Sequence, residues 1–543
     1  MQKASGYDKI FLYLLFKQGL FVLNIKKLIC VILSAVFVCS LCSCGSTDYT
    51  DKNITYRTQD NISSLDPQLA KTSAEFTAAV NCFEGIMTLS EDGSLTTGAA
   101  DEYEVSENGL EYTFKLRGGM LWSDGETKVT ADDYAYGLIR ALLPETKAPF
   151  ASLLYNIKNA KEVNSGKKSY DTLGIKTDGE LTLKITLSEP DRNLLRTLAN
   201  PVSMPCNRAF FDSTNGKYGL DDDSIMGNGV YYLKMWNTED NYLSLRRFEH
   251  YNGVQAIPYS ITLGFGREIT DIHTSLVNDE INMGVLDGEY ASRLDSDKYG
   301  MRLFYNTSYV LLLSPKAPEK IRKALVCDIN ITALQMNLPS YFDVTSGIIP
   351  PSAKEGNANY RDSVGVLKLH NYDAAKAKEL IGEVSKAYED GIDYEKYTLY
   401  YPAGDADVKK SAGMLAQSWQ NDLNAFINTQ EYSGADYIDK LSRGEMMAAI
   451  VPIQSVTGSA YDAANMLSQL GVSGYSKLLP SAGADTQNSC KSLERAEQYL
   501  VDNCYAVPLF GEPIFCCMTD NISGAVFSAS GSITFFKYIK KED

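Results

Sequence analysis

The N-terminal stretch constrains this chain more than any other part of its sequence. Lys26 and Lys27 precede an uncharged apolar run that extends from Leu28 to Leu41, and the small residue Ser43 follows it closely. A basic start, a short apolar core and a small residue before the cleavage site are typical of a secretory signal peptide that is removed after export. We therefore expect the mature protein to fold outside the cytoplasm.

The end of this signal resembles a lipobox, with Leu41 at position −3, Ser43 at −1 and Cys44 at +1. In signals of this kind the cysteine thiol is acylated and the cysteine becomes the new N-terminus. Cys44 is the predicted lipid attachment site, carrying palmitate, and Cys42 is a poorer one because Leu41 would occupy its −1 position. Residues 44–53 would then form the lipid anchor and tether on the extracytoplasmic face of the cell membrane. The alternative is an uncleaved anchor helix, but an apolar run of about 14 residues is short for a bilayer.

Residues 1–43 together are interpreted as a leader and a lipoprotein signal peptide. Residues 1–24 precede the basic start of the signal and contain a second apolar patch, from Ile10 to Phe16. A signal peptide does not usually have so long a leader, which leads to the hypothesis that translation starts downstream of Met1.

Length and composition predict a folded protein of two or three lobes. The sequence has 543 residues, more than one ordinary core accommodates, and 44% of them are hydrophobic, as in globular proteins. The formal net charge is -17. Phosphate binding needs clustered Lys and Arg, so this acidic balance argues against nucleic acid as a partner. No long Pro- or Gly-rich linker divides the chain, which suggests that the backbone passes from one lobe to the other more than once.

The residue types that usually carry catalysis or bind metals form no recognisable constellation. His250, His273 and His370 are far apart in the sequence, and no HExxH, GxSxG or P-loop motif occurs. Seven cysteines follow Cys44 without a CxxC pair, and this odd number favours buried free thiols over a disulfide framework or a zinc site. One or two disulfides are still compatible with an extracytoplasmic protein. We therefore expect no enzyme activity, no metal and no cofactor.

Helical and strand patterns alternate along the chain, which predicts an α/β protein. Strands are expected at residues 54–58, 112–117, 181–187, 231–236, 242–245 and 505–509. Helices are expected at residues 74–87, 130–143, 321–327, 374–381, 411–423 and 493–501. Thr130 should cap the second of these helices, where Asp132 and Asp133 in the first turn also suit the helix dipole.

Several short segments, taken in order, resemble the bacterial extracellular solute-binding proteins of family 5, the oligopeptide, dipeptide and nickel class. They are Leu65-Asp66-Pro67; residues 81–87 (NCFEGIM), 112–117 (YTFKLR), 121–125 (LWSDG) and 129–134 (VTADDY); Asn228-Gly229-Val230-Tyr231 with Trp236; His250-Tyr251-Asn252; residues 321–325 (IRKAL); Ala496-Glu497; and Val507-Pro508-Leu509. Each segment is weak alone, but together they span residues 54–540 in the family's order. Within this class the chain is most similar to the oligopeptide-binding lipoproteins of ABC transporters.

The resemblance implies an α/β, two-lobed periplasmic-binding-protein-like fold (type II, cluster C) with an extra domain and a ligand cleft between lobes that close on the ligand. It implies a discontinuous lobe I of residues 54–85, 198–300 and 510–543, an extra domain of residues 86–197, and a lobe II of residues 301–509. In peptide binders of this class the ligand backbone pairs with protein strands as an added strand, and its side chains enter hydrated pockets.

The function implied is that of the extracytoplasmic substrate-binding lipoprotein of an ABC importer, which captures oligopeptides in a closing cleft and delivers them to the permease. Its partners would be the peptide, the ABC permease subunits and the membrane that holds its lipid, and the mature protein would be a monomer. The alternatives are a binder of a non-peptide solute, such as a glycan or a metal chelate, and a surface or signalling lipoprotein that has lost peptide transport. An extracellular hydrolase is disfavoured by the missing catalytic constellation.

Five positions that match the family are candidates for ligand contact. Tyr136 matches a pocket tyrosine in the helix that follows the Val-Thr-Ala motif. Asn228 and Gly229 match a loop that faces the cleft. Tyr432 and Phe510 match places where the family has aromatic residues in the cleft. For each position, plain packing is the alternative interpretation.

The segment from Ile450 to Ala460 departs from the family's pattern and holds a sixth candidate, Ser455. Oligopeptide binders have a W.aDY.dp pattern here, whose Asp pairs with the amino terminus of the peptide, whereas this chain has Ser455 or Val456 in its place, depending on the alignment. A buried ammonium group without a counter-ion is costly. This protein therefore either anchors a peptide differently or binds something other than a free peptide amine. Asp462 is near enough in the sequence to substitute.

Overall fold

The computed structural model describes residues 53–343, 347–386, 392–481, 484–531 and 533–542. The predicted signal peptide, Cys44 and nearly all of the predicted tether lie outside these residues. Within the described part of the chain, no helix has the length and apolar character needed to cross a membrane.

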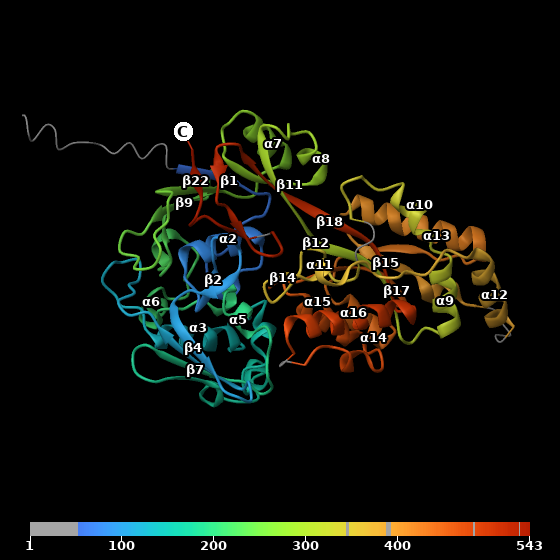
Figure 1. Cartoon of the computed structure of the whole chain (residues 1–543), viewed down its shortest axis with the longest axis horizontal. Coiled ribbons are helices and arrows are strands. Elements are labelled where there is room, and N and C mark those ends of the chain that lie inside the picture. Colours follow the sequence, from blue (N-terminus) through green and yellow to red (C-terminus); the bar gives the residue numbers. More distant parts are fainter. Residues whose placement is uncertain (1–52, 344–346, 387–391, 482–483, 532, 543) are drawn as a thin grey trace, which may run out of the picture. The chain divides into compact units, whose positions relative to one another are not determined.

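A ten-stranded mixed sheet contains two long antiparallel strands at its centre, β12 (Tyr299–Leu313) and β18 (Ala506–Thr519) (Figure 1). In spatial order the strands are β16 (Thr429–Tyr432), β15 (Leu399–Pro402), β17 (Ala448–Gln454), β12, β18, β11 (Met283–Leu286), β1 (Asn53–Arg57), β10 (Ser260–Gly264), β9 (Tyr242–Arg247) and β8 (Tyr231–Asn237). The register of β12 against β18 shifts between Tyr305 and Thr307 and again between Tyr309 and Val310. Such irregularities bend a sheet locally.

We call residues 53–298 and 520–542 lobe I. Its main core joins β1, β9 and β10 to helix α2 (Ser73–Cys82), which begins with a capping box between Thr72 and Glu75. A separate antiparallel sheet, in the order β4-β5-β7-β6, packs on α3 (Ala131–Leu142). Lobe I further contains β2 (Met87–Leu89), β3 (Leu95–Thr97), β4 (Ala100–Val105), β5 (Glu111–Leu116), β6 (Ile175–Thr177), β7 (Thr182–Thr186), β19 (Ile522–Ser523), β20 (Val526–Phe527), β21 (Thr534–Phe535), β22 (Lys540–Lys541), α4 (Ala160–Asn164), α5 (Leu194–Thr197), α6 (Arg208–Ser213), α7 (Ile269–Val277) and α8 (Gly288–Ala291).

We call residues 314–505 lobe II, which has a hydrophobic core on each face of β12. Leu311 and Leu313 pack with α9 (Glu319–Cys327), α12 (Ala374–Ser385) and α13 (Ala406–Leu423), whereas Val310 and Leu312 pack with α14 (Tyr437–Arg443), α15 (Ala460–Met466) and α16 (Thr486–Asp502) (Figure 1). A strand that is covered on both faces is apolar at consecutive positions, which explains the unbroken apolar run at the end of β12. The remaining elements of lobe II are α10 (Ile331–Gln335), α11 (Tyr360–Val364), β13 (Lys354–Glu355) and β14 (Ala358–Asn359).

The predicted strands and helices are present, although several of their ends differ. Thr130 is the N-cap residue of α3, as predicted, and the Asp133 carboxylate accepts its backbone N–H at 2.8 Å. The helix expected at 411–423 starts earlier, at Ala406, because Asp405 caps a first turn that lacks apolar periodicity. The strand expected at 505–509 continues to Thr519, through two prolines. The predicted domain boundaries stay a prediction.

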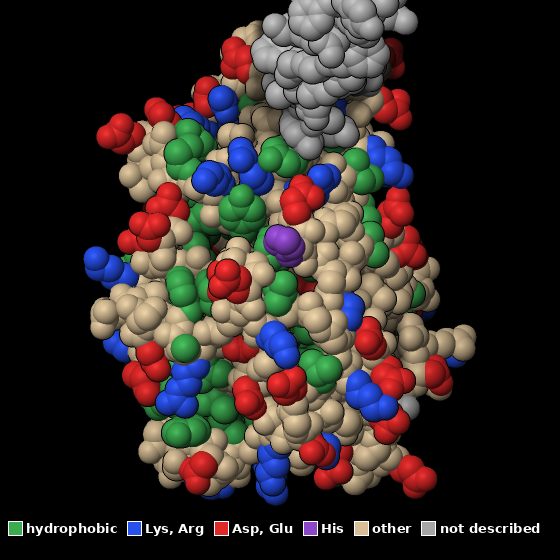
Figure 2. Space-filling model, turned by 90° about the vertical axis from the view of Figure 1, so that its left-hand side faces the viewer, with side chains coloured by type: hydrophobic (Ala, Val, Ile, Leu, Met, Phe, Trp, Pro, Cys, Tyr) green, Lys and Arg blue, Asp and Glu red, His purple; other side chains and the backbone are tan. Residues whose placement is uncertain are grey.

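The charged surface and the cysteines are those of a folded protein. On the face shown in Figure 2, acidic and basic side chains are interspersed with small apolar patches and do not form a continuous basic surface. All seven cysteines in the described part of the chain are free, and all of them but Cys327 are buried. The prediction of buried free thiols is therefore confirmed for most of them.

Candidate ligand-binding site

The two lobes contact each other through a polar loop of lobe I that leads into α5. Arg192 Nη2 of this loop lies 2.8 Å from Glu355 Oε1 of lobe II, and the two side chains are only 12% and 4% exposed. Glu355 Oε1 also accepts a hydrogen bond from Ser489 Oγ of α16 at 2.6 Å. One turn further along, Arg196 Nη2 donates to the backbone oxygen of Gly356 at 2.5 Å. The β13–β14 hairpin is thus tied to lobe I by arginine side chains.

Asp462, in the first turn of α15, lies at the same junction. The side chain of Asn193 donates from Nδ2 to Asp462 Oδ1 at 2.5 Å, and Thr457 Oγ1 donates to Oδ2. Asn193 Oδ1 in turn accepts Ser459 Oγ at 2.9 Å. Burial, reinforced by the nearby Asp191, raises the pKa of Asp462 to about 6. The carboxylate that could substitute for the family's Asp is therefore bound by a side chain of the other lobe.

Ser455 belongs to this network. It follows the last residue of β17 and is buried, and its Oγ lies 3.5 Å from Thr457 Oγ1. Its backbone oxygen accepts the N–H of Gly458 at 3.1 Å, which closes the turn that carries Thr457. Ser455 is therefore separated from Asp462 by a single hydroxyl group.

Phe510 lies in an aromatic cluster on the central strands. Its ring centroid is 5.0 Å from that of Tyr309 on β12 and 5.3 Å from that of Phe342, on which it stacks. The strand register places Tyr309 between Phe510 on β18 and Pro452 on β17. Because Ser455 follows β17, Phe510 and Ser455 are both positioned by these three adjacent strands.

The Tyr309 hydroxyl joins two carboxyl groups beside this aromatic cluster. Its oxygen lies 2.8 Å from Asp405 Oδ2 and 3.0 Å from Glu512 Oε2. A hydroxyl group has one hydrogen, so it cannot donate to both carboxylates at once. Burial and then the charge of Asp405 raise the pKa of Glu512 to about 7. Below that pH, a protonated Glu512 donates to Tyr309, and Tyr309 donates to Asp405.

We expect the Glu512→Gln substitution to remove a pH dependence of stability. Glu512 has a folded pKa near 7 and an ordinary value of 4.5, so the folded state binds the extra proton and its stability falls as the pH rises from about 4.5 through 7. The full loss of unfolding free energy is about 3 kcal/mol. Urea unfolding at pH 5 and pH 8 measures it, with Glu494→Gln on α16 as the control. If the unfolding free energy changed between pH 5 and pH 8 by the same amount in the wild type and in Glu512→Gln, the result would contradict this assignment.

Comparison with known proteins identifies the family. The family model "Bacterial extracellular solute-binding proteins, family 5 Middle" matches residues 94–475. The chain belongs to this family. Among its relatives, the dipeptide-binding protein of Lactococcus lactis is 28% identical over 410 residues, which cover 70% of this chain and 72% of the relative. The probable deoxycholate-binding periplasmic protein YgiS of Escherichia coli is 22% identical, over 86% of this chain and 90% of its own length.

A solved structure supports the architecture. Listeria monocytogenes OppA bound to peptide superposes with a TM-score of 0.70 at 20% identity, over 91% of this chain and 99% of that chain. The predicted α/β, two-lobed periplasmic-binding-protein-like fold is confirmed. The relatives are solute-binding proteins and not enzymes, so the prediction that the chain is not an enzyme is confirmed as well.

Two of the predicted family 5 contact positions lie in other aromatic clusters. Tyr136 of α3 contacts the ring of Phe211, with centroids 6.1 Å apart, and the Arg208 guanidinium lies 5.5 Å from its ring centroid. Tyr432 of β16 packs edge-on against Tyr437, with centroids 4.9 Å apart. Both side chains are half-buried, and the structure does not bring either of them to Ser455 or Phe510 by a described contact. Ligand binding by these two residues stays a prediction.

Asn228 and Gly229 have structural partners within lobe I. Asn228 is 3% exposed, and its side chain accepts the N–H of Glu84 at 2.9 Å and donates to the Tyr134 hydroxyl at 3.0 Å. The N–H of Gly229 donates to the Cys82 backbone oxygen at 2.9 Å, which fixes β8 against the end of α2. Ligand contact by this pair also stays a prediction.

Sequence reasoning missed the residues that meet at the junction of the two lobes. Arg192 and Asn193 lie in a short polar loop that matches no family motif, and Glu355 lies in a two-residue strand. No periodicity or spacing marks these residues. The only available signal was the concentration of charge between Glu189 and Arg196.

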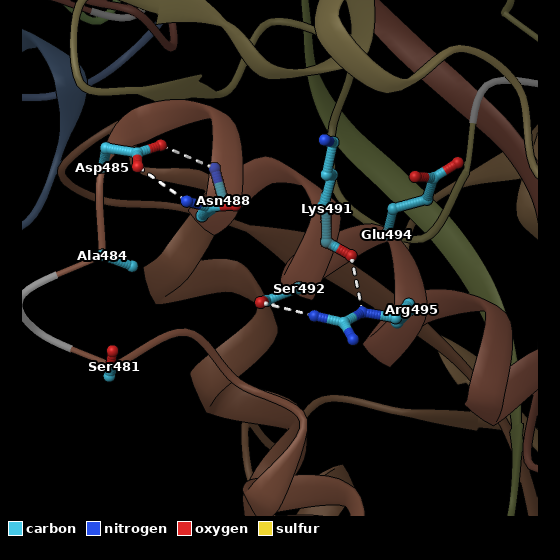
Figure 3. A pocket seen from close by; sticks show the side chains of 8 residues that line it. All are labelled: Ser481, Ala484, Asp485, Asn488, Lys491, Ser492, Glu494 and Arg495. Carbon is cyan, nitrogen blue, oxygen red and sulfur yellow. Dashed lines mark hydrogen bonds between the residues drawn. The ribbon is translucent and has the colours of Figure 1, made fainter.

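A groove of about 840 Å³ lies along α16 (Figure 3). It is lined by Ser481, Ala484, Asp485, Asn488, Lys491, Ser492, Glu494 and Arg495. Four of its polar side chains are paired with one another: Asn488 donates to Asp485 at 2.7 Å, and Arg495 donates to Ser492 at 3.1 Å. It lacks the aromatic residues of the central strands, and we do not assign the ligand to it.

Proposed function

We propose that this chain is the extracytoplasmic substrate-binding lipoprotein of an ABC importer, which is anchored at Cys44, binds oligopeptides between its lobes and delivers them to a permease. The lipobox-like sequence before Cys44 supports the anchor. The observation that carries the binding role is the pair β12 and β18, which connect separately packed cores and bear Phe510, Tyr309 and Glu512 between them.

The chemistry of this region suits a peptide. The buried aromatic rings of Phe510, Phe342 and Tyr309 form an apolar cluster against which a ligand side chain would pack. The carboxyl groups of Asp405 and Glu512 offer acceptors to an amine or a guanidinium group. The relatives named for dipeptides and oligopeptides support the same ligand class.

Thermal unfolding of residues 45–543 against a library of two- to eight-residue peptides tests this function. With a peptide at a hundred times its dissociation constant, we expect a stabilisation of about 2.7 kcal/mol and a higher unfolding midpoint. Free-amine and N-acetylated peptides should be run side by side. A shift with free amines alone means that a carboxylate such as Asp405 binds the amine, and an equal shift means binding without amine recognition. No shift with any peptide contradicts the proposal.

A non-peptide solute is the second candidate, for a specific reason. The relative named for deoxycholate spans 86% of this chain, and the Ser455 segment lacks the carboxylate that the family resemblance implies for a peptide amine. The same assay should therefore include deoxycholate below its micellar concentration. A shift with deoxycholate and none with peptides would replace the oligopeptide by an amphipathic acid as the ligand.

A further inference from the structure

The lobes are held together by groups of the protein itself. Arg192 forms its buried ion pair with Glu355, and Asn193 donates to the Asp462 carboxylate. We call these four residues the clasp. Lobe I supplies one partner of each pair and lobe II supplies the other, so both pairs break when the lobes separate. Hydrogen bonds to ionised groups are about twice as strong as neutral ones, which makes their loss costly.

We propose that the clasp closes the lobes in the absence of ligand, and that Asp462 makes this closure stronger as the pH falls. The hydrogen bonds of the clasp join protein groups only. Each carboxylate is already oriented within lobe II, Glu355 by Ser489 Oγ and Asp462 by Thr457 Oγ1. This preorganisation lowers the entropic cost of docking lobe I.

The groups around Asp462 determine the sign of the pH effect. Burial is the largest cause and raises the pKa of Asp462 from 3.8 to about 6, although hydrogen bonds from Thr457 and Asn193 oppose this rise. Among the charged groups of lobe I, Asp191 raises the pKa further and Arg196 lowers it. Tyr461, next to it in α15, is itself half-buried and neutral in this range. Opening returns Asp462 to water and to its ordinary pKa. The closed state therefore binds the proton more tightly, and closure should strengthen about tenfold between pH 7 and pH 5.

The backbone N–H of Leu95 provides a reporter of closure. It belongs to lobe I and donates to Asn357 Oδ1 of lobe II at 3.0 Å, so it is protected from exchange only while the lobes are closed. We would measure hydrogen–deuterium exchange at single-amide resolution on the full chain in detergent, without ligand. Asn193→Ala and Arg192→Ala should speed exchange at Leu95 about tenfold. Asn207→Ala, which removes a helix cap inside lobe I, is the matched control and should leave it unchanged.

The outcomes separate cleanly. Equal exchange at Leu95 in the wild type and both clasp variants overturns the proposal. The Leu311 amide in β12 reports whether a variant is folded. If Leu311 loses protection in a variant, Asn193→Asp, which places a second carboxylate next to Asp462, is measured in its place. Faster exchange at Leu95 in Asn193→Asp then supports the proposal, and exchange equal to that of the wild type overturns it. After correction for intrinsic rates, protection at Leu95 should rise from pH 7 to pH 5 in the wild type and not in Asp462→Asn. A wild type without this rise overturns the pH dependence. No peptide is present, so failure of peptide binding would not affect the result.

Discussion

The Glu497→Ala variant should lose about 3–5 kcal/mol of unfolding free energy, because it leaves a buried arginine without its counter-ion. Glu497 of α16 is 0% exposed, and its Oε1 lies 2.8 Å from Arg361 Nη2. The same oxygen accepts the N–H groups of Ile348 and Ile349 at 2.9 and 2.8 Å, and Oε2 accepts the Tyr360 hydroxyl at 2.6 Å. One carboxylate therefore ties α11 and the chain before it to α16.

Urea unfolding measures this loss as a lower midpoint at an unchanged slope. Glu494→Ala, one turn earlier on α16, is the matched control, because Glu494 lines the groove in Figure 3 and is only half-buried. We expect the control to change stability by less than about 0.5 kcal/mol. The double variant Glu497→Ala, Arg361→Ala should lose less than the two single variants added together, since it leaves no unpaired charge. A loss below about 1 kcal/mol in Glu497→Ala would show that Arg361 finds another partner.

Glu497 also illustrates why the fold was predictable. Ala496-Glu497 matches a family motif, and the structure shows that the Glu497 carboxylate binds Arg361 and the backbone N–H of Ile349. The strand at 112–117 and the helix at 130–143 were predictable for a different, local reason. Their apolar periodicity and end caps are encoded within a few residues of one another. Element ends were less predictable where a polar first turn, as at Ala406, carries no periodicity.

The candidate site was less predictable because its contacts join distant parts of the chain. Asn193 and Asp462 are 269 residues apart, and Tyr309 and Glu512 are 203 residues apart. No local pattern can encode such a pair. Ser455 was singled out because a carboxylate was missing there, and the structure places it one hydroxyl from Asp462.

The Gly229→Ala substitution should lower the free energy of unfolding by about 2–3 kcal/mol in the absence of any ligand. A Cβ at this position would lie 2.6 Å from the carbonyl carbon of Cys82 and 2.7 Å from the backbone nitrogen of Phe83. These are backbone atoms at the end of α2, which cannot rotate away as a flexible side chain would. The methyl group would push β8 from the helix and strain the hydrogen bond between Gly229 and Cys82.

Gly413→Ala is the matched control for this prediction. Gly413 lies inside α13, and a Cβ there would meet nothing within 4 Å, so the substitution should stabilise the protein by about 0.5–1 kcal/mol through helix propensity. The same substitution, glycine to alanine, is thus expected to change the free energy of unfolding in opposite directions at the two positions. Gly229 was proposed from the sequence as a ligand contact, and the test separates that role from packing. If Gly229→Ala keeps the wild-type midpoint without ligand but loses the stabilisation by peptides, the residue contacts the ligand and the packing interpretation is wrong.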